Sequence, residues 1–451
     1  MSEEKPSIRV VLDGVFFQLA NTGIARYWRS VLAHWDPKEA GCEIFFLNRG
    51  GQIPQNCQIK LIDFEPFRYE SSGEDALKCE VLCKELKADL FLSTYYTTPT
   101  ETPSITIFYD MIPERMGLNL KQRPWREKRL SILHADNVLT ISKSSQEDLK
   151  YYYPDHATHS TYIAYSGVEE NFYPVEKEKI LSFRQKYKLE KLYLLVVGTR
   201  MTGKGYKNTE LIFKAMHQWK DANRYQIVCA GGLPQLETRL KRYLPDKNVL
   251  VKSFSDEELT AAYAGAHCCV YPSRYEGFGQ PIVEAMKCGC PVITCFNSSL
   301  KEIGKDAVLY INPDSIIDLR EKILELEEPV TRSRCIQRGF KEATSFTWEN
   351  TAIQVKKAIL SAVRNQTKNN PVQWHRFRTL QAELQRQSID DESLSAFEET
   401  WLAEQKSNRN FTETEEAQLL QRFKPSLWGQ AKTKSVRYLK KRAKAILRKS
   451  A

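Results

Sequence analysis

The sequence predicts an α/β protein with two Rossmann-like, doubly wound domains, followed by a mainly helical, basic C-terminal extension. Short apolar runs typical of buried strands alternate with helical segments as far as about Leu360, which favours mostly parallel sheets covered on both faces. The alternation restarts after a polar stretch that follows Val168 and ends near Lys191, and this indicates a second domain. A chain of 451 residues is ample for two cores and an appendage.

The first domain is expected to begin with the strand Ile8–Asp13 and a loop from Gly14 to Thr22. Apolar residues then recur from Ile24 to Trp35 at nearly the 3.6-residue period of an amphipathic helix. Further strands are expected at Glu43–Leu47, Leu90–Ser93, Ile105–Asp110, Val138–Ser142 and Tyr162–Tyr165. Those of the second domain are expected at Tyr193–Val197, Ile227–Ala230, Val249–Val251, Cys268–Tyr271, Pro291–Thr294 and Val308–Ile311.

The net charge of +10 comes entirely from the end of the chain. Lys424 to Ala451 contains ten Lys and Arg and no acidic residue, so the body is neutral and does not favour specific binding of nucleic acid. Val436, Leu439 and Ile446 recur at helical spacing among these basic residues. The pattern suits a helix on an anionic membrane surface, and a disordered basic tail or one that touches RNA is an equal alternative.

The rest of the composition points to the cytoplasm. No run of 18 apolar residues occurs, and the start of the chain lacks the pattern of a signal peptide. The eleven scattered cysteines do not form the paired spacing of a zinc site, and free thiols suit a reducing compartment. We therefore expect a cytoplasmic protein that the basic tail can hold at the inner face of a membrane.

The strongest local pattern is the stretch from Tyr271 to Cys290, YPSRYEGFGQPIVEAMKCGC. It predicts a strand, a glycine-containing loop from Pro272 to Gln280, and a short helix that Gly289 ends. The loop lies after a strand and before a helix, where doubly wound sheets bind ligands. The N–H groups at Gly279 and Gln280 would favour an anion there.

Two carboxylates bracket this turn, Glu276 in the loop and Glu284 in the first turn of the helix. Each alone is explained as an acid favoured by the helix dipole or as a solvated loop residue. Together they indicate a site for a ligand that carries phosphates and hydroxyls.

A second glycine loop follows the strand that ends at Val197. It is nearly a Walker A loop, but Gly205 stands where a Ser or Thr would ligate Mg²⁺, which disfavours an NTPase. Arg200, Lys204 and Lys207 are available there for phosphates, with a solvated basic loop as the simpler alternative.

The segment EGFGQPIVEAM resembles the E-x7-E segment of the retaining nucleotide-sugar glycosyltransferases of family four. Other similar segments are Thr22–Tyr27, the S-K-x-S-like Ser142–Ser144, and Phe346–Glu349 at the start of the last helix. The resemblance runs from about Ile8 to Leu360 and implies the GT-B architecture of two facing domains.

The resemblance also implies residue roles. Glu276, Arg200 and Lys207 would be catalytic, with the two cations on the donor diphosphate and Glu276 stabilising positive charge on the sugar; Lys204 stays a substitute. Donor-binding residues would be Gly23, Glu284, Phe278, Gly279 and Gln280, with Glu284 on the ribose. Sugar or acceptor-side contacts would be Tyr109, Asp110 and Ser142. Many relatives have His where Tyr109 stands, and a turn or helix cap at a strand end explains Asp110 equally well.

The expected reaction is transfer of a sugar from a nucleotide-diphosphate sugar to a glycan or lipid-linked acceptor, with retention. The TGIxRY-like segment favours mannose. No D-x-D triplet occurs, so no metal and no other cofactor is expected. The alternatives are a glycosidase that uses Glu276 and Glu284, a nucleotide-sugar epimerase of the same architecture, and a non-catalytic nucleotide-sugar-binding protein.

The domain limits follow from the same reasoning. Residues 1–190 would form the acceptor-side domain and residues 191–345 the nucleotide-sugar-binding domain. Residues 346–366 would form a helix that crosses back to the first domain, and residues 367–451 a charged helical extension. Within the extension, Gln373 to Gln421 suggests two exposed helices in a loosely packed charged hairpin, with oligomerisation or partner docking as the alternative.

Overall fold

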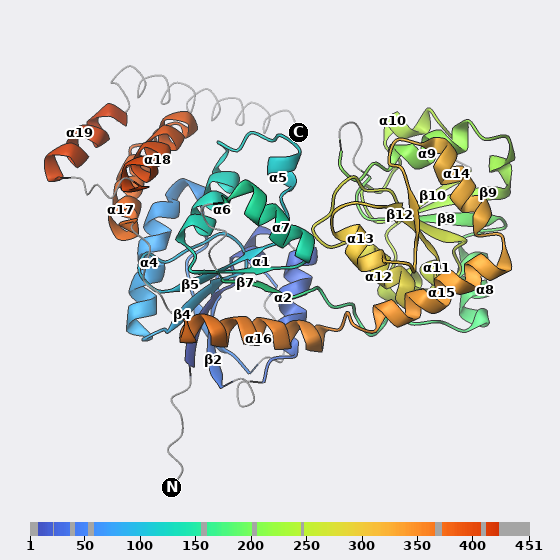
Figure 1. Ribbon diagram of the computed structural model, residues 1–451, viewed down its shortest axis with the longest axis horizontal. Helices are drawn as coiled ribbons and strands as arrows, with labels where there is room; N and C mark the ends of the chain where they lie inside the picture. Colours follow the sequence, from blue (N-terminus) through green and yellow to red (C-terminus); the bar gives the residue numbers. More distant parts are fainter. Residues whose placement is uncertain are drawn as a thin grey trace, which may run out of the picture.

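The computed structural model describes residues 8–20, 22–36, 41–52, 58–154, 160–200, 205–244, 248–365, 372–406 and 412–423. Two parallel sheets, each flanked by helices, form two α/β domains that lie side by side (Figure 1). The predicted fold class is thereby confirmed. Lys204 and the basic segment 424–451 lie outside the described residues.

The first domain is built on a seven-stranded sheet in the order β3-β2-β1-β4-β5-β6-β7. Its strands are β1 Ile8–Asp13, β2 Cys42–Asn48, β3 Lys60–Asp63, β4 Leu90–Ser93, β5 Ser104–Phe108, β6 Asn137–Thr140 and β7 Ser160–Ile163. Its helices are α1 Val15–Leu19, α2 Gly23–Ala33, α4 Ser72–Glu85, α5 Ile112–Arg115, α6 Arg123–His134 and α7 Lys143–Tyr152, with a 3₁₀ turn at Tyr69–Ser71. Among the central strands, β4 is fully buried and β1 is buried from Val10 to Asp13, as their apolar runs predict.

The second domain has a six-stranded sheet in the order β10-β9-β8-β11-β12-β13. Its strands are β8 Leu192–Val197, β9 Tyr225–Ala230, β10 Val249–Lys252, β11 Cys268–Tyr271, β12 Val292–Cys295 and β13 Leu309–Ile311. Its helices are α8 Lys177–Lys186, α9 Glu210–His217, α10 Thr238–Lys241, α11 Asp256–Ala264, α12 Gln280–Lys287, α13 Ser298–Gly304, α14 Ile316–Glu325 and α15 Pro329–Ala343, with a 3₁₀ turn at Lys220–Arg224.

Three elements differ from the sequence-based expectation. The edge strand β3 is short and mostly exposed, so it lacks the apolar run by which the other strands are recognised. Helix α1 replaces much of the loop expected from Gly14 to Thr22. Helix α8 lies within the stretch expected to be a polar connection, and it packs against α11, where the Tyr187 hydroxyl donates to Glu258 Oε1 at 2.7 Å.

Helix α16, Trp348–Arg364, runs along the first domain (Figure 1). Its first residue, Trp348, is buried in the main core, and the Thr351 hydroxyl donates to the carbonyl of Tyr165 at 2.7 Å. The chain thus returns from the second domain to the first before the extension begins.

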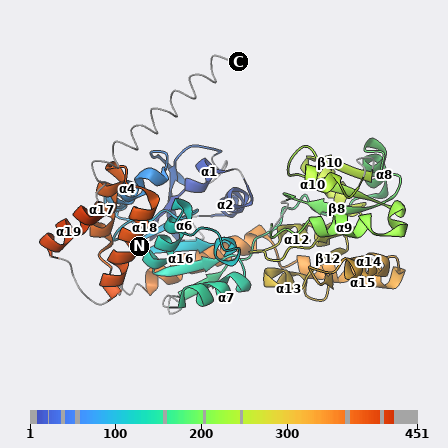
Figure 2. The same ribbon diagram turned by 90° about the horizontal axis from the view of Figure 1, so that it is seen from above.

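The extension contains three helices, α17 Trp374–Arg386, α18 Asp391–Lys406 and α19 Glu413–Phe423. They lie on the side of the first domain that faces away from the second domain (Figure 2). Their buried apolar cluster consists of Leu130, Trp374, Phe377, Leu380, Leu384, Ile389, Leu394, Phe397, Trp401, Leu402, Leu419 and Leu420. The expectation of an exposed, loosely packed hairpin is therefore wrong, because each helix contributes an apolar face to this cluster.

Buried charges also join the extension to the first domain. Arg378 of α17 pairs with Glu127 of α6 at 3.0 Å, and Arg126 of α6 pairs with Glu398 of α18 at 3.1 Å. The Gln381 side chain donates to the other oxygen of Glu398 at 2.9 Å. Burial, opposed by the charge of Arg126 and assisted by that of Glu127, raises the pKa of Glu398 to about 7.

This pKa predicts a pH-dependent docking of the extension. The folded-state pKa of Glu398 lies above the ordinary 4.5. Its contribution to stability is therefore fully present below about pH 4.5, and it is lost as the pH rises through about 7. Glu398→Gln, which resembles the protonated form, should gain stability over the native protein between pH 5 and pH 8, by at most about 3 kcal/mol. Thermal unfolding of both proteins across this range checks the prediction, with the exposed Glu392→Gln as control. A difference between native protein and Glu398→Gln that does not change with pH would contradict it.

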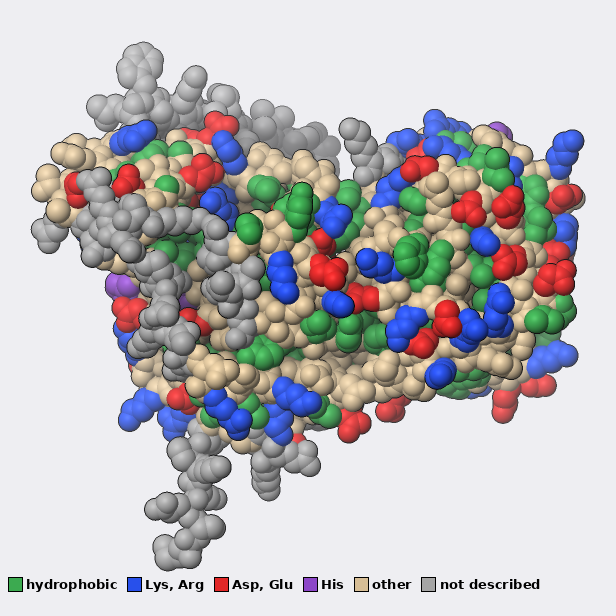
Figure 3. Space-filling model, in the orientation of Figure 1, with side chains coloured by type: hydrophobic (Ala, Val, Ile, Leu, Met, Phe, Trp, Pro, Cys, Tyr) green, Lys and Arg blue, Asp and Glu red, His purple; other side chains and the backbone are tan. Residues whose placement is uncertain are grey.

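Two further findings concern the location expected for the protein, in the cytoplasm and at the inner face of a membrane. Among the described residues, no helix is both long and apolar enough to span a membrane. Acidic and basic side chains are intermixed on the face of the body that Figure 3 shows.

Candidate active site

A pocket of about 320 Å³ opens between the two domains. The first domain contributes the N-terminus of α2 and the residues that follow β5, and the second contributes the loops after β8 and β11. The carboxyl ends of parallel strands in both sheets therefore face one site, the place where such sheets bind ligands. Its lining is Thr22, Gly23, Ile24, Arg26, Tyr27, Tyr109, Asp110, Ile112, Ile141, Ser166, Val197, Gly198, Tyr206, Lys207, Tyr271, Glu276, Gly277, Phe278, Gly279, Gln280 and Pro281.

The loop between β11 and α12 forms the wall on the side of the second domain. Gly279 immediately precedes α12 with φ of +104°, a conformation that side chains with a Cβ rarely adopt. The Ser299 hydroxyl lies between the carbonyls of Glu276 and Phe278, at 2.9 and 2.7 Å, and fixes the course of the loop. The N-terminus of α12 consequently borders the pocket, where its free N–H groups suit an anion.

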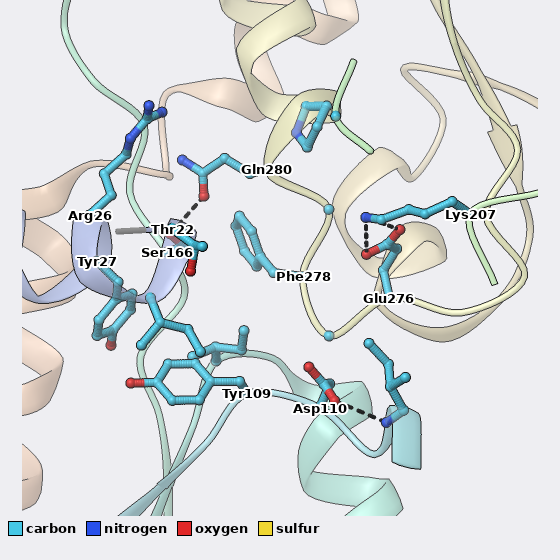
Figure 4. A pocket seen from close by; sticks show the side chains of 18 of the residues that line it. Thr22, Arg26, Tyr27, Tyr109, Asp110, Ser166, Lys207, Glu276, Phe278 and Gln280 are labelled. Atoms are coloured by element: carbon cyan, nitrogen blue, oxygen red, sulfur yellow. Dashed lines mark hydrogen bonds and ion pairs between the residues drawn. The ribbon is translucent and has the colours of Figure 1, made fainter. Parts of the chain in front are cut away.

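Lys207 and Glu276 form an ion pair at the pocket wall (Figure 4). Lys207 Nζ lies 2.8 Å from Glu276 Oε1 and 3.0 Å from Oε2, and it also donates to the Tyr271 hydroxyl at 2.7 Å. Both side chains are largely buried, at 18% and 8% exposure. Each charge therefore neutralises the other, and a ligand phosphate that binds Lys207 must compete with Glu276.

Gln280 joins the two domains at the edge of the pocket. Its side-chain amide donates to the carbonyl of Gly167 at 2.8 Å, and its oxygen accepts from the Ser166 hydroxyl at 2.8 Å (Figure 4). In this structure its side chain therefore orients the domains, and its backbone belongs to the helix N-terminus.

Tyr109 and Asp110 line the pocket from the first domain. The Tyr109 hydroxyl accepts from Trp28 Nε1 at 2.7 Å and donates to the carbonyl of Thr94 at 2.9 Å, so its polar end is held within its own domain. Asp110 accepts the N–H of Ile112 at 2.9 Å at the start of α5, and burial raises the pKa of its carboxyl group. Asp110 thus combines the expected turn contact with a place at the pocket.

Glu284 is buried behind the lining. It accepts the Tyr263 hydroxyl at 2.8 Å, and its other oxygen lies 3.7 Å from a guanidinium nitrogen of Arg26, which belongs to the first domain. Burial raises the pKa of Glu284, and the bond from Tyr263 and the charge of Arg26 oppose that shift.

Two more predicted residues, like Glu284, lie outside the lining. The Arg200 guanidinium is buried and donates to Glu237 at 3.0 Å and to the carbonyls of Gly231 and Leu233, both at 2.5 Å. Ser142 caps α7 by accepting the N–H of Ser145 at 2.9 Å. The structure therefore brings together Gly23, Tyr109, Asp110, Lys207, Glu276, Phe278, Gly279 and Gln280, but not Arg200, Ser142 or Glu284.

Sequence reasoning missed several residues of the site. The sequence predicts Tyr271 only as a strand residue, although its place at the carboxyl end of β11 puts it at the edge of the sheet that faces the pocket. Arg26 and Ser166 contact Glu284 and Gln280 across the domain boundary, and no local pattern indicates such partners. Among the described residues, no three His, Cys, Asp or Glu side chains are grouped as a metal site would require.

Comparison with known proteins agrees with this geometry. Residues 178–342 match the family model described as glycosyl transferases group 1. The chain is 31% identical over 255 residues to the O-antigen chain mannosyltransferase B of Escherichia coli, a match that covers 52% of this chain and 63% of the relative. It is 28% identical over 260 residues to the mannosyltransferase RfbU of Salmonella typhimurium, covering 56% of this chain and 69% of the relative.

The fold is shared with solved structures. Sucrose-phosphate synthase from Thermosynechococcus elongatus superposes with a TM-score of 0.64 at 19% identity, over 80% of this chain and 100% of that one. Anabaena HepE in complex with UDP-glucose gives a TM-score of 0.62 at 16% identity, over 78% and 100%. Residues 178–342 therefore match the group 1 glycosyl transferases, within a chain that has the GT-B fold.

Proposed function

We propose that this protein is a retaining glycosyltransferase that moves a sugar from a nucleotide-diphosphate sugar to a glycan or lipid-linked acceptor. The observation that carries the proposal is the grouping of Lys207, Glu276 and the N-terminus of α12 around one pocket between the domains. Mannose is the proposed sugar, because the two relatives named above are called mannosyltransferases.

The donor diphosphate is proposed to bind between Lys207 and the N–H groups at Gly279 and Gln280. Binding would move Lys207 from Glu276 to a phosphate oxygen, which neutralises the leaving group. Arg200 would have to give up its contact with Glu237 to reach the diphosphate, and otherwise it orders the loop that contains Gly231.

The freed Glu276 carboxylate would then face the sugar and stabilise the positive charge that develops as the bond to the diphosphate breaks. The acceptor hydroxyl would attack from the same face and pass its proton to the leaving phosphate, so the configuration is retained without a protein nucleophile. Glu284, already oriented by Tyr263, would accept the ribose hydroxyls. Tyr109 and Asp110 would contact the sugar from the first domain.

An assay with radiolabelled nucleotide sugars tests the proposal. The protein is incubated with GDP-mannose, UDP-glucose or UDP-galactose, with and without lipid-linked and glycan acceptors, and the anomeric configuration of the product is read by NMR. We expect acceptor-dependent transfer with retention from one donor. Sugar interconversion without acceptor would indicate an epimerase, hydrolysis of simple glycosides a glycosidase, and donor binding without turnover a binding protein; each would contradict the proposal.

The transfer is predicted to be independent of metal ions, since Lys207 and backbone N–H groups are proposed to neutralise the diphosphate. The rate should stay within about twofold of its original value in excess EDTA, because no metal would contribute to the transition-state stabilisation. Loss of activity in EDTA with recovery on adding Mg²⁺ or Mn²⁺ would overturn the proposed role of Lys207.

The basic segment 424–451 is proposed to attach the protein to anionic membrane, on its sequence pattern alone. Each basic residue near such a surface contributes about 1 kcal/mol, so the segment can hold a neutral body there. The full chain should sediment with anionic vesicles at low salt, and a chain that ends at Phe423 should not. Equal sedimentation of both chains, or of neither, would contradict the proposal.

A further inference from the structure

Tyr275 belongs to the second domain but is buried in the first. It follows β11, immediately before Glu276, and its side chain is 1% exposed. The apolar cluster that surrounds it otherwise has its buried members in the first domain: Phe108, Met111, Ile132, Val138 and Leu149. The Tyr275 ring, which belongs to the second domain, is therefore inserted among apolar side chains of the first domain.

The hydroxyl of Tyr275 makes two hydrogen bonds to the first domain. It accepts the N–H of Met111 at 2.9 Å and donates to Asp148 Oδ2 at 2.8 Å. The other oxygen of Asp148 accepts from Arg115 at 2.6 Å, and the Arg115 guanidinium lies 5.0 Å from the centre of the Tyr275 ring. The first domain thus orients both the hydrogen-bond acceptor and a cation for this one phenol.

Glu276 and Gly277, the next two residues, connect Tyr275 to the pocket. Glu276 turns back toward Lys207, and Gly277 packs so closely on the first domain that a Cβ there would lie 2.0 Å from the Tyr109 carbonyl oxygen. The Ser145 hydroxyl of the first domain lies 3.3 Å from the Gly277 carbonyl oxygen and donates to it. Because the three residues are consecutive, seating of Tyr275 fixes where Glu276 lies relative to Asp110.

We propose that Tyr275 is a positioning residue that couples the apposition of the two domains to the placement of Glu276 in the pocket. The inference rests on the proposed function of that pocket. With Tyr275 seated, Glu276 faces the residues of the first domain; with Tyr275 withdrawn, the domains separate and Glu276 leaves with its own domain.

The variant Tyr275→Phe keeps the ring and removes both hydrogen bonds of the hydroxyl. We expect kcat for transfer to fall roughly tenfold, as the loss of buried hydrogen bonds implies. The Kd for GDP or UDP should not change, because the proposed diphosphate contacts lie in the second domain. Small-angle X-ray scattering should give a larger radius of gyration for the variant, and this reading needs no activity.

Tyr193→Phe is the matched control. Tyr193 is fully buried, and its hydroxyl donates to the Ala262 carbonyl at 2.7 Å inside the second domain. The Tyr193→Phe variant should lose a comparable buried hydrogen bond without a change in kcat or in radius of gyration. Asp148→Asn weakens the same contact from the first domain and should reproduce the pattern of Tyr275→Phe, which also covers the case in which Tyr275→Phe fails to fold.

Two outcomes would overturn the proposal. One is a native kcat and radius of gyration in Tyr275→Phe and Asp148→Asn. The other is loss of nucleotide binding together with kcat, which would indicate a general structural role. If the native protein transfers no sugar, the proposed function fails, and the scattering comparison still decides whether Tyr275 holds the domains together.

Discussion

Replacing Glu276 with glutamine should lower the kcat of sugar transfer by roughly 100-fold or more and yet tighten the binding of a nucleoside diphosphate. The carboxylate is proposed to act on charge that develops in the transition state, so its loss affects kcat more than KM. Its ion pair with Lys207 competes with the ligand phosphate, so Glu276→Gln leaves Lys207 free for the diphosphate. Steady-state kinetics and calorimetry with GDP and UDP measure the two effects.

The opposite effects on kcat and on nucleotide affinity make this result specific to the proposed role of Glu276. Glu321→Gln, at an exposed position of α14 in the same domain, is the control and should change neither quantity. A Glu276→Gln protein with native kcat, or one with weakened nucleotide binding, would contradict the proposed exchange of Lys207 between carboxylate and phosphate.

Gly277→Ala should abolish most of the activity for a steric reason. The added Cβ would lie 2.0 Å from the Tyr109 carbonyl oxygen and 3.0 Å from Asp110 Cβ, so the backbones of the two domains must move apart. A displacement of about 1 Å at a catalytic centre can lower the rate about 100-fold. We expect a loss of that size in kcat, measured with saturating donor.

The nucleotide affinity of Gly277→Ala should stay close to native, since the second domain keeps its own contacts. Gly339→Ala is the matched control, because its Cβ meets mainly the flexible Met286 side chain, at 3.2 Å, inside the second domain. Native kcat in Gly277→Ala would show that the close approach of the domains is not needed for transfer.

The local features of the site could be predicted from the sequence. The strand that ends at Tyr271, the glycine at position 279 and the helix that follows are set by neighbours in the chain, and the structure has them where the pattern places them. The same holds for most strands of both sheets, whose apolar runs are recognisable one at a time.

Features set by distant partners could not be predicted in this way. Arg200 lies in a glycine loop, where phosphate-binding residues are often found, but the carbonyls of Gly231 and Leu233 and the carboxylate of Glu237 hold its guanidinium. Tyr275 contacts Asp148, which lies 127 residues earlier, and no periodicity indicates that contact.

The packing of the extension could not be predicted from the sequence for a different reason. Trp374, Phe377 and Leu380 recur at helical spacing and could have indicated a buried face, but the many charges around them favoured an exposed hairpin. Several of these charges are themselves buried in pairs, such as Arg378 with Glu127, which the sequence does not reveal. A charged residue in the sequence therefore does not by itself indicate an exposed helix face, because a partner of opposite charge can allow it to be buried.

The most direct test of this account is a crystal structure of the protein with a non-hydrolysable nucleotide-diphosphate sugar. We predict that the diphosphate lies between Lys207 Nζ and the N-terminus of α12, that the sugar faces Glu276 and Asp110, and that Lys207 has left Glu276. A nucleotide bound elsewhere, or one bound in the pocket with the Lys207–Glu276 pair intact, would contradict the account.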